Sequence, residues 1–166
     1  ALESHVSRHA TPFTRALSEL ALAAIDRTLL PVYHGDFSGA ADLLEGSYLA
    51  GIALSHARLG VVHGLAHPLG SRWHAAHGLT CAVCLPAALA FNRPVIGAAL
   101  AGLRDRLGID VEARVAEWMA AMRLVSPFAG EPVRDREAII RETLASGSTA
   151  ANPRPVAAAD VDALLQ

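Results

Sequence analysis

The feature that most constrains this chain is the near absence of residue patterns that build β-strands. Ala, Leu, Arg and Glu dominate, β-branched and aromatic residues are sparse, and no stretch alternates cleanly between apolar and polar residues. Residues of the first kind favour helices, whereas strands draw on the second kind. We therefore predict an all-α fold: residues 1–166 form one bundle-like domain of seven to nine helices, with no linker long enough to divide it.

Capping and breaking residues place the expected helices along the chain. Thr11 and Pro12 begin a helix that is expected to stop before Pro31. A long helix that is apolar on several faces is expected to be central and to end at Pro68 and Gly70. The predicted ranges are residues 1–9, 12–30, 38 to the mid-60s, 78–91 with a bend at Pro86, 95–107, 111–124, 135–146 and 158–165.

Composition narrows the classes of partner. The net charge is −2, so the chain lacks the basic surplus that binding to nucleic acid requires. All 14 basic residues are Arg, which excludes a Schiff-base lysine and a phosphate-loop lysine. Two cysteines and no signal peptide favour a reducing, cytoplasmic setting, and we expect no membrane-spanning segment. Charged residues make up only 18%, which indicates a surface covered by another subunit or domain.

Four of the eight histidines lie within fifteen residues, in the segment Gly60 to Gly78. His63 and His67 are four residues apart and share one face of a helix, and His77 begins the next helix. Neutral imidazole is the commonest metal ligand and suits Zn, Fe or Ni. Histidines on adjoining helix ends can converge on one ion, so this cluster indicates metal binding or proton transfer.

Other catalytic interpretations have weaker support. No Glu follows the first histidine, as a zinc-protease motif would require, and residues 57–83 contain no carboxylate for a helical metallohydrolase. The pair Cys81 and Cys84 lies in an apolar helix, and we interpret both as core residues. No Gly-rich phosphate loop follows a strand pattern, so we assign no cofactor-binding residue in this chain.

The histidine segment resembles the second signature of the iron-containing (group III) alcohol dehydrogenases. It reads Gly-x-x-His-x-x-x-His-x-x-Gly, then His-Gly, then a helix with Leu-Pro, from Gly60 to Pro86. The stretch from Glu3 to Ala16 and the run Asn-Pro-Arg-Pro at 152–155 also resemble that family. The resemblance spans nearly the whole chain and implies the helical C-terminal domain of such an enzyme.

This resemblance implies a site for Fe²⁺, or Zn²⁺, held by one Asp and three His. His63 and His77 match the two late ligands, and His67 matches a histidine beside the metal that serves substrate and nicotinamide. His74 falls where the family varies and receives no ligand role. The two early ligands form Asp-x-x-x-His directly before an Ala-x-Glu that matches residues 1–3, so the second would immediately precede Ala1.

The implied reaction is oxidation of an alcohol to an aldehyde or ketone, or its reverse, with hydride transfer to NAD or NADP. The nucleotide would bind an N-terminal α/β domain that this chain lacks, so we expect the chain alone to be inactive and the complete enzyme to be a homodimer or larger homo-oligomer. Alternatives are a non-catalytic scaffold or oligomerisation module with a degenerate metal site, and an enzyme resembling dehydroquinate synthase or glycerol dehydrogenase.

Overall fold

The computed structural model describes residues 1–130 and 132–166, and within them it contains helices and loops but no strand. The prediction of an all-α fold is therefore confirmed, and the described residues form nine α-helices, at the upper end of the expected number. The elements are α1 (Leu2–Val6), α2 (Pro12–Tyr33), the 3-10 helix η1 (Phe37–Gly39), α3 (Ala40–Ala57), α4 (Val61–Trp73), α5 (His77–Leu107), α6 (Val111–Ala121), α7 (Arg136–Ala145), α8 (Gly147–Ala150) and α9 (Ala158–Leu164).

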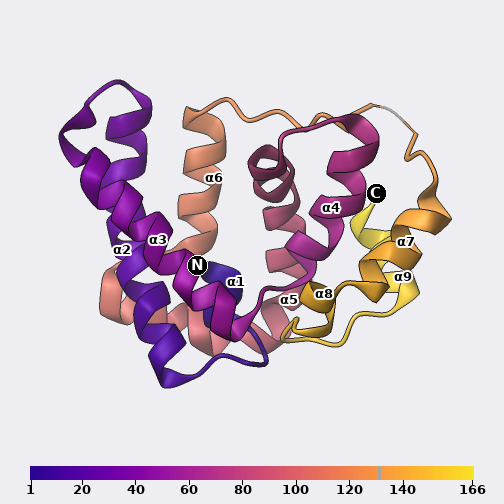
Figure 1. Cartoon of the computed structure of the whole chain (residues 1–166), viewed down its shortest axis with the longest axis horizontal. Coiled ribbons are helices and arrows are strands. Elements are labelled where there is room, and N and C mark those ends of the chain that lie inside the picture. The colour runs from indigo at the N-terminus through magenta and orange to yellow at the C-terminus, as the bar shows by residue number, and fades with distance from the viewer. Residues whose placement is uncertain (131) are drawn as a thin grey trace.

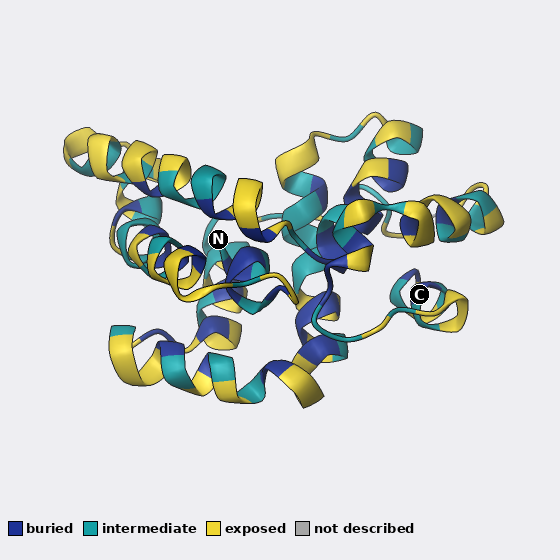
Figure 2. Cartoon of the chain, turned by 60° about the horizontal axis from the view of Figure 1, so that its bottom comes forward, coloured by how far each residue is buried: buried dark blue, intermediate teal, exposed yellow. Residues whose placement is uncertain are grey.

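The helices form two groups joined by α5 (Figure 1). The antiparallel pair α2 and α3 lies with α1 and α6 on one side, and α4 packs with α7, α8 and α9 on the other. The outer faces of α2 and α3 are largely exposed, whereas buried residues gather where the groups meet α5 (Figure 2). The long helix therefore serves as the common wall of both halves.

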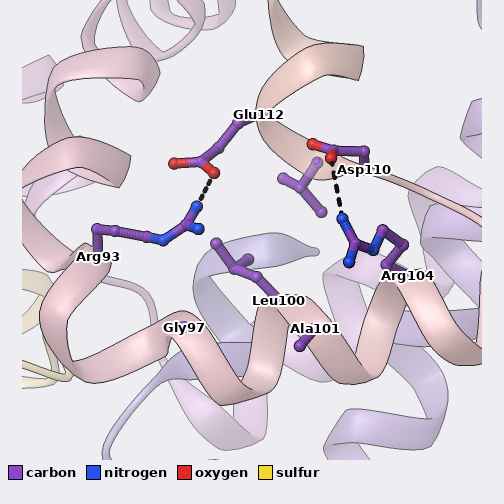
Figure 3. Close-up of a pocket in the computed structure, with 8 residues that line it drawn as sticks. Arg93, Gly97, Leu100, Ala101, Arg104, Asp110 and Glu112 are labelled. Atoms are coloured by element: carbon purple, nitrogen blue, oxygen red, sulfur yellow. Dashed lines mark ion pairs between the residues drawn. The ribbon is translucent and has the colours of Figure 1, made fainter.

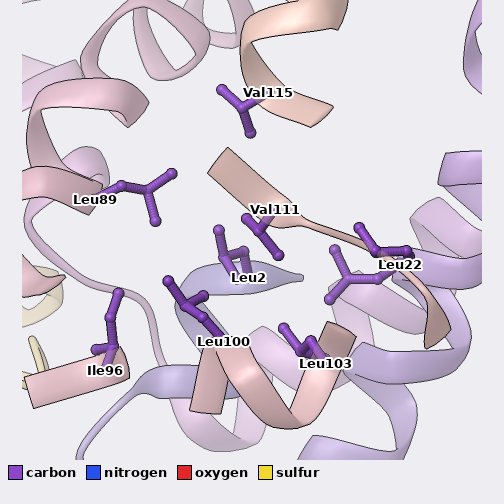
Figure 4. Packing of buried hydrophobic residues seen from close by; sticks show 9 residues of the cluster. Leu2, Leu22, Leu89, Ile96, Leu100, Leu103, Val111 and Val115 are labelled. Carbon is purple, nitrogen blue, oxygen red and sulfur yellow. The ribbon is translucent and has the colours of Figure 1, made fainter. Parts of the chain in front are cut away.

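Two clusters of buried apolar residues reflect this division. In the first, residues from the second half of α5 meet α1, α2 and α6, as Figure 4 shows. In the second, α4 packs against the first half of α5 and against α7 and α9. Leu85 on α5 packs against both clusters and so joins the two cores.

The helix predicted from residue 38 to the mid-60s is in fact two helices, and this prediction is wrong. α3 ends at Ala57 and α4 begins at Val61, and the two helices diverge by 105°. Arg58 adopts a left-handed backbone with a φ of 60°, which stops α3. Side chains distant in sequence stabilise the break, because the hydroxyls of Ser4 and Ser7 donate to the carbonyls of Arg58 and Ala57.

Proline did not end helices where the sequence analysis expected it to. α2 continues past Pro31 to Tyr33, and α4 continues past Pro68 to Trp73, where His74 takes a left-handed conformation. The two helices predicted at 78–91 and 95–107 are one continuous α5 that contains Pro86 and Pro94 and changes direction along its length (Figure 1). Pro68 is buried, whereas Pro31, Pro86 and Pro94 are exposed, so the packing of each helix as a whole compensates for the hydrogen bonds that the prolines remove.

The apolar character of α5 corrects another expectation. This helix has the length and composition of a membrane span, with a mean hydropathy of 1.5 over an 18-residue window. Residues 73–92 carry no Asp, Glu, Lys or Arg, so the chain contains a long uncharged run, although we expected no membrane-spanning segment. Core helices meet the same criteria, and α5 contributes to both apolar clusters.

Candidate metal centre

Three of the four clustered histidines meet where α4 and α5 adjoin. His63 lies in the first turn of α4, His67 lies one turn further along, and His77 is the first residue of α5. The ring centroids of His63 and His77 are 5.4 Å apart, and those of His67 and His77 are 5.3 Å apart with the rings nearly parallel. The predicted convergence of these three residues is confirmed, although their chemical roles remain predictions. His74 is exposed and ends α4.

A carboxylate from α1 holds the His63 ring in place. Oε2 of Glu3 lies 2.6 Å from Nδ1 of His63, and Oε1 of the same carboxylate accepts a hydrogen bond from the backbone N–H of Val62. The carboxylate thus satisfies one of the free donors at the start of α4 and places its charge at the positive end of the helix. With Nδ1 bonded to Glu3, Nε2 is the ring nitrogen available to a metal ion.

The pKa values of two histidines shift in opposite directions. Burial alone would lower the pKa of His63, but hydrogen bonds to Cys81 and Glu3 outweigh it and raise that pKa to about 9. Desolvation, followed by the charges of His63 and His67, lowers the pKa of His77. The site is therefore arranged around an anionic carboxylate on one side and a group of imidazoles on the other.

Cys81 is the unexpected member of the site. Its Sγ lies 3.5 Å from Nε2 of His77. His63, His77 and Cys81 each offer one donor atom, and these three atoms lie within 4.8 Å of one another. Both cysteines pack against the second apolar cluster, as the sequence analysis expected, but Cys81 also faces the histidines. Burial instead raises the pKa of the Cys84 thiol to about 12.

The donor set suits a transition metal. Two imidazoles and a thiol are ligands typical of Zn²⁺ and of related divalent ions, whereas Mg²⁺ and Ca²⁺ prefer oxygen. His63 is half-buried and His77 is exposed, so an ion at this position would retain an open side. The hydrogen bond to Glu3 supplies the outer-shell support that metal-bound histidines commonly have. The residues present therefore fit a bound metal ion.

A buried amide pair supports the start of α4 behind the site. Oδ1 of Asn152 accepts hydrogen bonds from the N–H of Val61 and from the amide of Asn92, and the Asn152 amide donates back to Oδ1 of Asn92. Gly60 permits this approach, because a Cβ there would lie 2.6 Å from a Glu3 oxygen and 2.9 Å from Oδ1 of Asn152. The first turn of α4, which carries His63, is therefore held from two sides.

His67 faces solvent on the outer side of the site. It borders two open hollows, one of about 470 Å³ against α7 and one of about 380 Å³ towards the end of α3. The residues that line these two hollows are mostly small or polar, and they include Ser71, Ser146 and Ser148. A small polar molecule can therefore approach the histidine cluster beside His67.

A smaller hollow elsewhere on the surface has a structural explanation. About 100 Å³ of space lies between α5 and the start of α6, where ion pairs join Arg93 to Glu112 and Arg104 to Asp110 (Figure 3). The charged groups satisfy one another across the hollow. They are separate from the histidine cluster and hold α6 against α5.

Sequence reasoning missed the roles of Glu3 and Cys81. It noted that residues 57–83 lack a carboxylate, and the structure supplies one from α1. Cys81 follows His77 by four residues on α5, which places the two side chains on one helix face. That spacing was a usable signal, but the apolar surroundings favoured a core interpretation.

Comparison with solved structures identifies the class of protein that this fold and site define. The chain superimposes over 99% of its length on an iron-containing alcohol dehydrogenase from Thermococcus thioreducens, with a TM-score of 0.88 and 26% identity, and covers 46% of that chain. It matches a 1,3-propanediol oxidoreductase with a TM-score of 0.80 and 26% identity over 99% of this chain and 47% of the other. The class is thus the helical half of metal-type alcohol dehydrogenases.

Sequence comparison narrows this class to a family. The chain is 28% identical to the lactaldehyde reductase of Escherichia coli K12 across 97% of its own length and 46% of that protein. It is 38% identical to long-chain-alcohol dehydrogenase 1 of Geobacillus thermodenitrificans across 65% of its length and 28% of that protein. Residues 1–166 match the C-terminal domain of the Fe-containing alcohol dehydrogenase family, and the chain belongs to that family. It spans about half the length of the first of these curated relatives.

Proposed function

We propose that this chain is the metal-binding helical domain of an NAD(P)-linked alcohol dehydrogenase. The observation that carries the proposal is the meeting of His63, His67 and His77 at the junction of α4 and α5, in a chain that belongs to the iron-containing family along its whole length. The reaction is the interconversion of an alcohol with an aldehyde or ketone. The nucleotide binds outside residues 1–166, in an N-terminal α/β domain.

His63 and His77 are the metal ligands in this proposal, with Fe²⁺ or Zn²⁺ as the ion. When bound, the metal supplies Lewis acidity that favours the alkoxide form of the substrate alcohol near neutral pH. Glu3 keeps Nδ1 of His63 occupied and thereby directs Nε2 towards the ion. The apolar cluster behind α4 and α5 fixes both ligands on packed helices rather than on loops.

His67 is the catalytic residue in this proposal. It is exposed, stacks on the ring of His77 and borders both hollows. From this position it can orient the substrate hydroxyl and pass the hydroxyl proton to solvent. Nicotinamide bound in the adjoining domain would supply the redox chemistry, as the acceptor of a hydride from the carbinol carbon. A homodimer or larger assembly would cover the exposed apolar surface of the chain.

Metal content of purified variants tests the ligand assignment. His63→Ala and His77→Ala should each lose the metal that the unaltered protein retains after dialysis, whereas the exposed His9→Ala should retain it. Alcohol-dependent reduction of NAD(P) is then measured in the complete gene product. Stoichiometric metal in either cluster variant contradicts the assignment. Absence of turnover with a full metal site would favour the non-catalytic scaffold.

A further inference from the structure

Cys81 stands in a position that the proposed function does not use. It is half-buried, and its Sγ points to the same space as the side chains of His63 and His77. The three side chains come from two helices, with His63 on α4 and the other two one turn apart on α5. A thiol placed beside two imidazoles in this way is a ligand set for a transition metal rather than a lone cysteine.

We propose that Cys81 is a metal ligand, so that His63, His77 and Cys81 bind one divalent ion through two imidazoles and a thiolate. The inference rests on the proposed function only in taking His63 and His77 as ligands. It adds that residues 1–166 contain three metal ligands of their own. It also adds that the ion is bound partly by sulfur.

The separation of the donor atoms supports this assignment. A tetrahedral zinc site with Zn–N near 2.05 Å and Zn–S near 2.3 Å has an N···S edge of about 3.6 Å. The distance from Sγ of Cys81 to Nε2 of His77 is 3.5 Å. All three donor atoms lie within 4.8 Å of one another, a spacing that is compatible with ligation of one ion. Binding releases two protons to solvent, the thiol proton of Cys81 and the Nε2 proton of His63, because cysteine ligates as the thiolate and histidine as the neutral imidazole.

The second cysteine provides an internal contrast. Cys84 lies three residues further along α5, where it lines the apolar hollow beneath α4 together with residues such as Leu65 and Leu69. Burial raises the pKa of its thiol to about 12, which keeps it protonated. It is absent from the group of donor atoms formed by the other three residues. Cys84 is therefore a matched control for Cys81 on the same helix.

A sulfur ligand changes which ions the site prefers. Thiolate is a soft donor that favours Zn²⁺ and Co²⁺ over Mn²⁺ and Mg²⁺, whose preferred ligands are oxygen. We expect Cys81→Ser, which keeps the side-chain size but replaces sulfur with a hydroxyl, to lower affinity for Zn²⁺ and Co²⁺ more than affinity for Mn²⁺. Cys81→Ala should do the same, and Cys84→Ala should leave the order of affinities unchanged.

The test is titration of the apo protein with Co²⁺ alone, followed by absorption spectroscopy. The unaltered protein and Cys84→Ala should develop the intense near-ultraviolet charge-transfer band that a cobalt–thiolate bond produces. Cys81→Ala and Cys81→Ser should lack this band and bind Co²⁺ at least about tenfold more weakly, in the range that loss of supporting metal-site partners causes. Far-ultraviolet circular dichroism should show that all variants remain helical.

The outcomes separate this inference from the proposed function. Co²⁺ bound by the unaltered protein without the charge-transfer band, and lost in His63→Ala, overturns the role of Cys81 and leaves the histidine ligands in place. In that case the thiol is only a hydrogen-bond partner of His77. Failure of the unaltered protein to bind Co²⁺ overturns the ligand assignments of the histidines and of Cys81 together.

Discussion

The Glu3 carboxylate lies 2.6 Å from Nδ1 of His63, across 60 positions of sequence. The same side chain accepts a hydrogen bond from the N–H of Val62, so it both begins α4 and orients the histidine that α4 carries. Both groups are largely buried, with side-chain exposures of 11% for Glu3 and 24% for His63, and the interaction is therefore poorly screened by solvent. The candidate metal centre therefore draws on α1 as well as on α4 and α5.

Replacing Glu3 with Gln should weaken metal binding about 10–100-fold. The two donors contact different oxygens of Glu3, and glutamine has only one oxygen. It can therefore accept from His63 or from the N–H of Val62 but not from both. If its amide instead faces the ring and donates to Nδ1, the His63 proton moves to Nε2, the nitrogen that a metal needs. The dissociation constant for Zn²⁺ is measured by competition with a chelator. Glu45→Gln, an exposed change on α3, is the control, and equal affinities in the two variants would contradict this role.

Asn152→Ala should destabilise the fold by about 3 kcal/mol, because it leaves buried groups of Val61 and Asn92 without partners. The free energy of unfolding is obtained from urea titrations at constant pH. Arg27→Ala provides the comparison, since its ion pair with Asp42 joins two well-exposed side chains and should contribute less than about 1 kcal/mol. Similar losses in both variants would show that the amide pair does not anchor α4.

Gly64→Ala should destabilise the contact between α4 and α8. A Cβ at Gly64 would lie 2.0 Å from Oγ1 of Thr149, so the two helices must separate or the threonine must rotate. We expect the free energy of unfolding to fall by about 1–3 kcal/mol. A second change in the same chain, Thr149→Ala, should restore part of this loss. Gly51→Ala should instead stabilise α3 by about 0.5–1 kcal/mol, since nothing lies within 4 Å of its added Cβ. Thermal melts of these three variants measure the differences.

The helical composition and the histidine spacing were sufficient to predict the fold class and the meeting of His63, His67 and His77. The sequence could not reveal the break between α3 and α4, because its caps are tertiary. The hydroxyls of Ser4 and Ser7 satisfy the end of α3, and Glu3 and Asn152 satisfy the start of α4. Local capping rules examine neighbouring residues and do not detect partners that lie 50 or more positions away.

Three prolines were misjudged, and the contact of Cys81 with His77 was not foreseen, for a related reason. Pro31, Pro68 and Pro94 lie within helices that were expected to end before or at them, and α2, α4 and α5 each pack against other helices, which outweighs the lost hydrogen bonds. Cys81 was assigned to the core from its apolar neighbours, and its contact with His77 depends on how α5 meets α4. In each case tertiary packing overrode a local preference, which is the usual limit of reasoning from one sequence.

Acid should destabilise the protein through His5. This residue is 1% exposed, and burial lowers its pKa, with Glu19 opposing and Arg15 and Arg106 reinforcing the effect. The unfolded chain therefore binds a proton at this residue near pH 6.5 while the folded chain does not, so the contribution of His5 to stability is full above about pH 6.5 and falls as pH decreases towards the lower folded pKa. Urea midpoints from about pH 7.5 to about pH 5 measure this slope.

The variant His5→Gln should flatten that profile, because it removes the titrating group from the core. His9→Gln, at an exposed position four residues further on and beyond the end of α1, should leave the slope as it is. A profile that stays equally steep in His5→Gln would assign the acid sensitivity to another group. Native fluorescence and circular dichroism at pH 7.5 provide the check that both variants fold.

His67→Ala should separate catalysis from metal binding. The residue stacks on His77 at a centroid distance of 5.3 Å and faces solvent beside two hollows, so its loss should leave the metal in place while reducing kcat about 100-fold or more, as expected for a group that handles a proton. Metal stoichiometry and steady-state rates of the complete gene product are measured together. His74→Asn is the matched control, because Asn tolerates the left-handed backbone at that position. Loss of the metal in His67→Ala would make His67 a ligand, whereas unchanged kcat with full metal would remove it from the reaction.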